Sequence, residues 1–128
     1  MIRTLVLTPD FPPAPGGIQL VAERIVRHAG GLECRVVTLA TPGAERFDRG
    51  AGLDVRRVPP LPGPRPLSVL ALNAAALAQA RAFRPRAVLC AHLALSPSAA
   101  AVRRALGVPV IQYFHAKEIG VRPRLAAF

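Results

Sequence analysis

Apolar positions along the chain recur in two alternating spacings, one typical of buried strands and the other typical of helices. The first is a continuous apolar run at 2–8, which suits a parallel strand that is covered on both faces. The second follows at 18–29, where apolar residues share one helical face and charged residues occupy the opposite face. Gly30 and Gly31 come next and predict a left-handed cap that ends this helix.

The alternation of strand and helix patterns continues to the end of the chain. We expect a loop at 41–52, which holds three glycines, and an extended connector at 59–66, where five prolines exclude a helix. Ser96 and Pro97 are expected as the N-cap and first residue of the last helix, which Gly107 ends. The remaining predicted elements are strands at 34–39, 54–58, 87–91 and 108–114 and helices at 67–83 and 97–106.

Strands that alternate with helices through short connectors predict an α/β domain with a doubly wound, Rossmann-like parallel sheet. We expect the strand order 3-2-1-4-5, with the polar third strand near an edge. Ligands of such sheets bind outside the carboxyl ends of the strands, where the strand order reverses. The loops that matter are therefore those after Thr8, Ala91 and Phe114.

The length of 128 residues is that of a single domain, residues 1–128. The last residues, 122–128, have the pattern of a helix that has just begun, so a domain that stopped there would leave its last strand poorly covered. We therefore expect a truncated chain; a small natural domain with a frayed tail is the alternative.

The charge is strongly positive, with 17 basic residues against 7 acidic ones and a net charge of +10. Such a surface attracts phosphates, acidic lipid headgroups or nucleic acid. Nucleic acid is disfavoured because tryptophan is absent and Tyr113 is the single tyrosine, so stacking platforms are missing. An anionic small molecule or a membrane surface therefore remains as the expected binding partner.

Arg81, Arg84 and Arg86 lie where the long apolar helix ends. This cluster can dock on anionic lipid; a solvated charged face is the alternative.

The compartment predicted by the sequence is the cytosol. No apolar run approaches the roughly 18 residues of a membrane-spanning helix. The short apolar start continues into Pro9 without a cleavage site, so it is read as a strand and not as a signal peptide. Cys34 and Cys90 lie in apolar strand patterns and are expected to be buried, reduced thiols.

The segment after the first strand, 9–18, is the first candidate for chemistry. Its prolines stiffen the loop, and Gly16 and Gly17 let the backbone approach a ligand at the start of a helix. Free N–H groups and the positive end of the helix dipole suit a phosphate or another anion there. Neither G-x-G-x-x-G nor a P-loop is present. A glycine pair that serves only as a turn is the alternative.

Two histidines form the second candidate, because His92 follows the fourth predicted strand and His115 the fifth. Both therefore face the same crevice. Imidazole there can donate to a sugar hydroxyl or accept its proton near neutral pH. Glu118 can orient His115, although Lys117 can instead pair with Glu118 at the surface.

Other kinds of site are not indicated. No cysteine–histidine cluster has the spacing of metal ligands, so no metal site is predicted. Ser96 and Ser98 are better explained by helix capping than by nucleophilic catalysis. No carboxylate pair has the setting of a glycosidase, and the solitary Asp10 does not form the acidic cluster of a response regulator.

Three motifs in this order resemble glycosyltransferase family 4. They are FPPAPGGIQ at 11–19, RPRAVLCAH at 84–92, and LGVPV at 106–110 with His115 and Glu118 behind it. Enzymes of this family are similar to two-domain GT-B glycosyltransferases, which transfer a sugar from a nucleotide donor with retention of configuration and without an obligatory metal. The resemblance implies that residues 1–128 are the N-terminal, acceptor-side domain, and that a donor-binding domain would follow Phe128.

The resemblance also implies roles for individual residues. His115 would contact the transferred sugar as the catalytic residue. The substrate-binding residues would be Gly16, Gly17, Gln19, His92 and Glu118. Two positions depart from the family pattern: Arg86 stands where an acidic residue is common, and Ala116 where glycine usually follows the histidine.

The expected partners are a nucleotide sugar and an acceptor glycan or lipid, with no cofactor and no nucleic acid. The Gly-Gly-Ile-Gln form of the first motif especially resembles actinobacterial mannosyltransferases that act on phosphoinositide lipids. A mannosyl transfer in the cytoplasm, at the inner face of the membrane, is the corresponding expectation. A non-catalytic module that binds a nucleotide or another anion is the alternative function.

Overall fold

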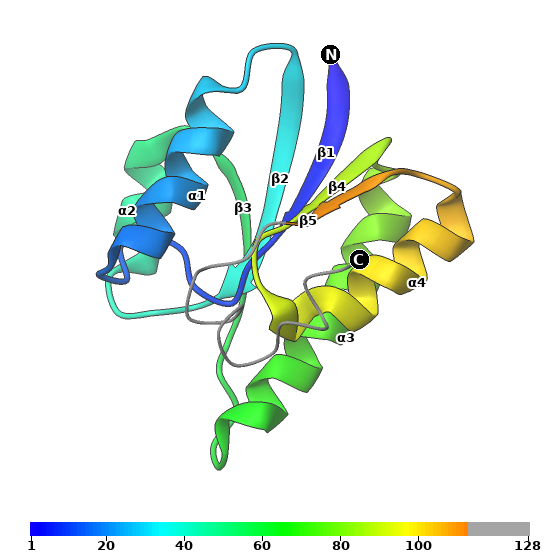
Figure 1. The fold of residues 1–128 in the computed structure, drawn as a ribbon. Helices are drawn as coiled ribbons and strands as arrows, with labels where there is room; N and C mark the ends of the chain where they lie inside the picture. Colours follow the sequence, from blue (N-terminus) through cyan, green and yellow to red (C-terminus); the bar gives the residue numbers. More distant parts are fainter. Residues whose placement is uncertain (113–128) are drawn as a thin grey trace.

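The computed structural model describes residues 1–112 and shows one five-stranded parallel sheet between two helical layers (Figure 1). The strands are β1 (Ile2–Leu7), β2 (Leu32–Leu39), β3 (Asp54–Val58), β4 (Ala87–Cys90) and β5 (Val110–Gln112). Their order is β3-β2-β1-β4-β5, and all neighbours are parallel. The predicted α/β class and the order 3-2-1-4-5 are thus confirmed, with β3 at an edge.

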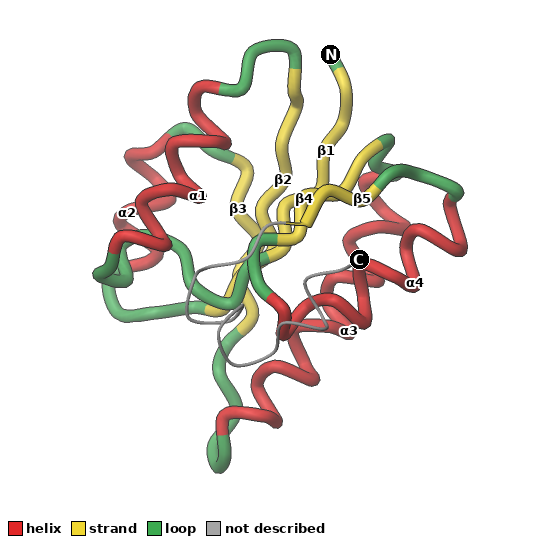
Figure 2. Tube along the Cα trace, in the orientation of Figure 1, coloured by secondary structure: helices red, strands yellow, loops and turns green. Residues whose placement is uncertain are grey.

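Helices cover both faces of the sheet. They are α1 (Gly17–His28), α2 (Ala44–Ala51), α3 (Arg65–Phe83), a 3-10 turn η1 (Leu93–Leu95) and α4 (Ser96–Leu106). Helices α1 and α2 lie on one face, and α3 and α4 lie on the other (Figures 1 and 2). We call these two groups the α1/α2 layer and the α3/α4 layer. None of the helices within 1–112 is both long enough and apolar enough to cross a bilayer.

The two faces of β1 feed two separate cores, because successive side chains of a strand point to opposite sides. Leu5 and Leu7 pack under the α3/α4 layer, in a cluster that includes the fully buried Leu72. Val6 points the other way and packs with Phe11 under the α1/α2 layer. Every one of these five side chains is fully buried, which explains the continuous apolar run of the first strand.

The expectation of a loop at 41–52 was wrong, since α2 occupies most of this segment. Two of the three glycines stand at its ends, where Gly43 (φ 83°) and Gly52 (φ 68°) adopt left-handed conformations that begin and end the helix, and Gly50 lies in its last turn. Between them, Ala44 is buried and Phe47, one turn later, is half-buried against the core. The glycines therefore delimit a helix instead of filling a loop.

Two further helix ends differ from the prediction. Helix α3 begins at Arg65, because Pro66 fits the first turn of a helix, where its missing N–H is not needed. Helix α1 ends on Ala29 in an extended conformation, and of the glycine pair only Gly31 takes a positive φ (82°), at the start of β2. The predicted cap at Gly107 is confirmed, with φ 65°.

Helix α4 begins differently from the predicted serine cap. Ser96 is already helical, and neither Ser96 nor Ser98 caps the helix through its side chain. Instead, the side chain of Asn73 on α3 crosses to the start of α4. Its Oδ1 accepts from the Ser98 N–H at 3.2 Å, and its Nδ2 donates to the Ala94 carbonyl at 3.1 Å. A residue of one helix therefore caps its neighbour, which a local sequence pattern cannot reveal.

Both cysteines are free, as expected for reduced thiols. Cys90 is buried, whereas Cys34, near the start of β2, is only partly buried. Burial raises the pKa of the Cys34 thiol, which lowers the fraction of reactive thiolate at neutral pH.

Candidate functional site

The carboxyl ends of the parallel strands meet at one edge of the sheet, which we call the carboxyl edge. The glycine loop (residues 8–17) and the turn after β4 both lie at this edge. Of the predicted site residues, Gly16, Gly17, Gln19 and His92 are described, whereas His115 and Glu118 lie outside the described residues. The structure therefore places four of the six predicted residues.

The glycine pair begins α1 as predicted, but its two members differ. Gly16 is the N-cap with φ 137°, a conformation that favours glycine, and a Cβ atom there would collide with the Gln19 side chain, which folds back over it. A Cβ atom at Gly17 would meet no atom within 4 Å. Gly16 is thus required by the turn, while Gly17 borders open space at the mouth of the helix.

That mouth has the character of an anion site. The first N–H groups of a helix have no intrahelical acceptor, and the helix dipole is positive at this end. Among residues 1–112, no side chain caps the α1 N-terminus, and the first turn of α1 contains no acidic residue. The first-turn N–H groups are consequently available to a negatively charged ligand.

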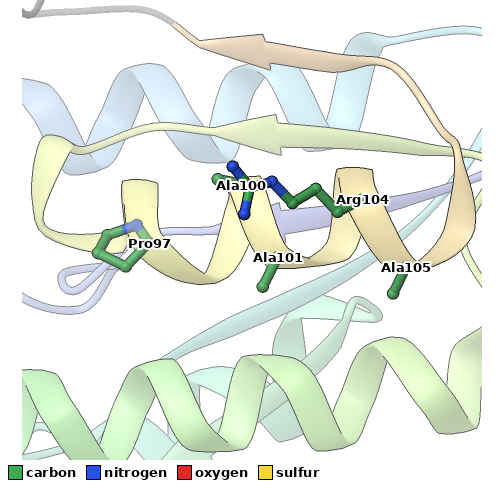
Figure 3. A pocket seen from close by; sticks show the side chains of 5 residues that line it. All are labelled: Pro97, Ala100, Ala101, Arg104 and Ala105. Carbon is green, nitrogen blue, oxygen red and sulfur yellow. The ribbon is translucent and has the colours of Figure 1, made fainter.

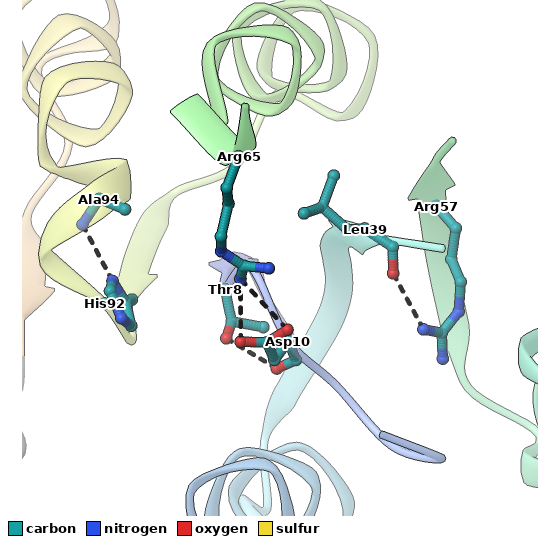
Figure 4. A network of polar contacts seen from close by, with 7 residues as sticks. All are labelled: Thr8, Asp10, Leu39, Arg57, Arg65, His92 and Ala94. Atoms are coloured by element: carbon teal, nitrogen blue, oxygen red, sulfur yellow. Dashed lines mark hydrogen bonds and ion pairs between the residues drawn. The ribbon is translucent and has the colours of Figure 1, made fainter. Parts of the chain in front are cut away.

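Arg57 on β3 holds the glycine loop in place, a role that no local sequence pattern indicates. Its side chain is only 8% exposed and forms a bidentate ion pair with Asp48 of α2, at 2.9 and 3.0 Å. The same guanidinium donates to the Leu39 carbonyl at 3.2 Å (Figure 4). It also donates to the carbonyl of Pro12 in the loop. One arginine therefore ties the loop to the end of β2 and to α2.

Phe11 anchors the same loop from below. The ring is fully buried, meets Phe47 of α2 edge to face with centroids 6.2 Å apart, and lies 5.9 Å from the Arg57 guanidinium. The loop is thus held by an apolar anchor and by a charged clamp. This double attachment fixes the approach of the chain to Gly16 and the start of α1.

A second arginine lies over the carboxyl edge from the opposite layer. Arg65, in the first turn of α3, pairs with Asp10 at 3.2 Å, and Thr8 Oγ1 donates to the Asp10 carbonyl at 2.9 Å (Figure 4). Both charged side chains are exposed, so the pair contributes little to stability. Its effect is to place a guanidinium beside the glycine loop, where it adds positive potential.

His92 stands at the carboxyl end of β4 as predicted. Its Nδ1 accepts a hydrogen bond from the Ala94 N–H at 3.0 Å and so caps the turn η1 (Figure 4). Its carbonyl accepts from the Cys90 thiol at 3.2 Å. These bonds fix the orientation of the imidazole, with the ring held at the carboxyl edge.

The other features of the described chain do not form a competing site at this edge. No group of three or more histidine, cysteine or acidic side chains within 1–112 is arranged to hold a metal ion. A hollow of about 510 Å³ lies instead along the outside of α4, and no predicted site residue lines it (Figure 3). The lining residues are Pro97, Ala100, Ala101, Arg104 and Ala105.

Arg57 and Arg65 had only a weak signal in the sequence. Both belong to arginine-rich, polar or proline-rich segments that the strand and connector patterns explain without a function. Their contacts span 9 to 55 residues of sequence separation, so no local spacing reveals them. The glycine and histidine positions were accessible because they follow predicted strands directly.

Proteins of known fold share this architecture. Crystal structures of MurG from Acinetobacter baumannii and of the Streptomyces sp. SF2575 glycosyltransferase SsfS6 superpose with TM-scores of 0.63 and 0.58. Their sequence identities to this chain are 14% and 22%; each match covers 88% of this chain and, respectively, 35% and 39% of the other protein. At these identities the likeness shows the fold alone.

Two curated relatives come from Mycobacterium tuberculosis, strains CDC 1551 / Oshkosh and ATCC 25618 / H37Rv. Both are named GDP-mannose-dependent alpha-(1-6)-phosphatidylinositol monomannoside mannosyltransferase, and each is 41% identical to this chain over 73 residues. The match covers 50% of this chain and 19% of the relative, so it spans about a fifth of each relative's length.

The sequence profile described as Glycosyltransferase Family 4 matches residues 15–127. This match runs from the end of the glycine loop through every later strand and helix, and agrees with the motifs at 11–19, 84–92 and 106–110. The chain belongs to glycosyltransferase family 4.

Proposed function

We propose that residues 1–128 are the N-terminal, acceptor-side domain of a retaining glycosyltransferase that moves a sugar from a nucleotide donor to an acceptor. The observation that carries this proposal is the uncapped start of α1 behind the glycine loop, at the carboxyl edge of a family 4 domain. The remaining donor-binding groups would come from a second domain, and residues 1–128 alone would be inactive.

The chemistry of sugar transfer suits this edge. A departing nucleoside diphosphate develops negative charge, which preorganised N–H groups and cations stabilise. The start of α1 supplies the N–H groups, Gly17 leaves room for close approach, and Arg65 adds positive potential. Because these groups are held in place by Arg57 and Phe11, little reorganisation accompanies the reaction.

The remaining roles rest on the family resemblance. His115 would contact the transferred sugar and act in catalysis, and Glu118 would orient it. Gln19 and His92 would bind substrate from the start of α1 and the end of β4. No metal and no cofactor takes part in this proposal.

The substrates that we propose follow from the similarity to the mycobacterial mannosyltransferases. The donor would be GDP-mannose, and the acceptor a phosphoinositide lipid carrying mannose. Such an acceptor would place the reaction at the inner face of the membrane, in the cytoplasm.

The test is an assay of GDP-mannose consumption by the full-length protein. The variant His115→Ala should lose roughly 10²-fold in kcat, as expected when an acid–base or sugar-contacting group is removed. His28→Ala is the matched control, since His28 is exposed on the last turn of α1, away from the glycine loop. Turnover of His115→Ala near that of the wild type would reject the catalytic role.

Two further outcomes bear on the proposal. Tight binding of GDP-mannose without turnover by the full-length protein would favour the non-catalytic module. Turnover by residues 1–128 alone would contradict the division of the active site between two domains.

A further inference from the structure

The outer face of α3 is apolar, although it points away from the sheet. Leu67, Leu70, Ala74 and Leu77 follow one another at helical spacing and are all exposed, with Leu70 68% and Leu77 40% accessible. The opposite face of the same helix is buried on the sheet through Leu72 and its neighbours. A helix that is apolar all round is expected to be covered on both sides.

Positive charge is concentrated in the same half of the chain. Residues 1–54 hold six arginines and six acidic residues, so they are neutral overall. Residues 55–112 hold eight arginines and no acidic residue. The α3/α4 layer thus belongs to a segment of charge +8 in which no carboxylate offsets the cations.

The arginines of this layer lie around its apolar face. Arg81 stands in the last turn of α3 on the same side as Leu70 and Leu77, and Arg84 and Arg86 follow directly. Arg103 and Arg104 stand in the last turn of α4. All five side chains are exposed, and within 1–112 none of their guanidinium groups has an ion-pair partner.

The hollow along α4 extends this surface. Its lining is alanine and proline apart from Arg104, whose side chain lies back along the helix toward Ala100 (Figure 3). The outer surfaces of α3 and α4 therefore combine exposed leucines, small apolar residues and unpaired cations.

We propose that this outer surface of the α3/α4 layer docks on an anionic lipid membrane. Leu67, Leu70 and Leu77 would enter the boundary between headgroups and acyl chains, and the arginines would bind lipid phosphates. The apolar stems of the arginines allow both at once, because the guanidinium reaches the phosphates while the stem stays on apolar surface.

Charge favours a membrane over the other partners that could bind this surface. Two copies of this surface would each bring the same uncompensated arginines into contact, which repel. A nucleic acid would match the arginines but would leave the leucines without a partner, and no aromatic side chain is exposed on the helices of this layer to stack with bases. Anionic lipid matches both components.

This docking would bring the candidate site close to the membrane. The first turn of α3, with Arg65, lies at the carboxyl edge beside the glycine loop. With α3 lying on the lipid surface, that edge would border the membrane. The proposal goes beyond the sugar transfer and does not depend on it.

The test is flotation of the complete chain with vesicles of phosphatidylcholine alone or mixed with phosphatidylglycerol. We expect binding to the mixed vesicles only, and weaker binding as salt is raised. The double variant Leu70→Gln/Leu77→Gln should lose at least about tenfold in affinity. The matched control is Leu20→Gln/Val21→Gln, which changes two residues of the α1/α2 layer that are 50% and 47% exposed and should keep the wild-type affinity.

A second pair of variants tests the charges. Arg81→Gln/Arg104→Gln should lose about 25-fold, from about fivefold for each arginine near an anionic surface. Arg24→Gln/Arg46→Gln removes the same charge from exposed positions of the α1/α2 layer and should lose far less. Because all eight positions are exposed or half-exposed, thermal unfolding should show that the variants fold normally.

Four results would overturn the proposal. Two of them concern the vesicles: equal binding to both kinds of vesicle, or equal losses of vesicle affinity for the variants of the α3/α4 layer and the control variants of the α1/α2 layer. The other two concern another partner: tighter binding to an oligonucleotide than to the mixed vesicles, or a dimer in solution that Leu70→Gln dissociates. Each is distinguishable from failure of the proposed sugar transfer, because no step of this experiment uses a nucleotide sugar.

Discussion

The two helical layers cover the same sheet by different physical means. In the α1/α2 layer, a charged side chain joins the two helices: Arg27 of α1 bonds Glu23 at 2.7 Å and the Ala51 carbonyl of α2 at 3.2 Å. Asp48 of α2 in turn holds Arg57 of the sheet. The two helices carry four arginines and three acidic residues, so their charge is nearly balanced.

The α3/α4 layer is attached mainly by apolar packing. Its core contains Leu72, Ala76 and Ala80 of α3 and Val102 of α4. In the core beneath the α1/α2 layer, Ala22 is the one fully buried helix residue among the side chains that the structure describes. On its outside, Leu67, Leu70 and Leu77 are exposed. One layer joins its two helices through a charged side chain, whereas the other is held by apolar packing and also exposes leucines, the surface that we propose docks on a membrane.

The largest effect is expected in the apolar core. Leu72→Ala should lower the free energy of unfolding by about 3 kcal/mol, because it removes a fully buried side chain and leaves a cavity. Leu70→Ala on the outer face of the same helix should cost less than about 0.5 kcal/mol. Urea denaturation of both variants measures the difference, and similar losses would mean that the outer face is covered in solution.

Breaking the polar clamp of the α1/α2 layer is the next effect in size. Arg57→Met should cost about 2 kcal/mol, since it leaves Asp48 and the Pro12 carbonyl without their shared partner. Arg56→Met is the control, because Arg56 is exposed and its pair with Asp54 should contribute well under about 1 kcal/mol.

A double-mutant cycle with Asp48→Asn sharpens this prediction. Asp48 and Arg57 should show a coupling energy of about 1 kcal/mol or more if the bidentate pair acts as a unit. Additive effects of the two substitutions would contradict the view that the Asp48–Arg57 pair acts as one clamp.

Arg57→Lys gives a kinetic test in the full-length protein. It should raise KM for the donor more than it lowers kcat, because lysine keeps the positive charge and loses the planar, two-pronged guanidinium that holds the loop.

The glycine pair offers a smaller, local test within the α1/α2 layer. Gly16→Ala should cost about 1 kcal/mol, from its φ of 137° and from the collision with Gln19. Gly17→Ala should leave thermal stability almost unchanged, since its Cβ would meet open space, and yet should weaken donor binding. Destabilisation by both substitutions would show that the pair is only a turn.

The smallest expected effect concerns Asp54 at the start of β3, which pairs with Arg35 and Arg56. Partial burial alone would raise the pKa of this carboxyl, but hydrogen bonds and charge from Arg56 and Arg35 outweigh it and hold the pKa below the ordinary 3.8. Its stabilisation is therefore present above pH 3.8 and is lost as the pH falls through the lower, folded-state pKa. In this acidic range, the free energy of unfolding of Asp54→Asn should fall less steeply with decreasing pH than that of the wild type. Parallel curves of unfolding free energy against pH for the two proteins would contradict a lowered pKa of Asp54.

The sequence predicted the parts of the molecule that depend on local pattern. The strand order, the long helix α3 and the glycine turn at α1 all follow from periodicity and from residues adjacent to strands. The helix α2 was missed because its short length and terminal glycines imitate a loop. The clamp at Arg57 and the cap from Asn73 were missed because each depends on contacts between distant segments that only the folded chain brings together.

The hydrogen bond that caps η1 limits the chemistry open to His92. With a lone pair of Nδ1 engaged by the Ala94 N–H, the neutral ring carries its proton on Nε2. In this neutral form the ring has no basic nitrogen left with which to deprotonate a nucleophile. A general base for the proposed sugar transfer would have to come from another residue.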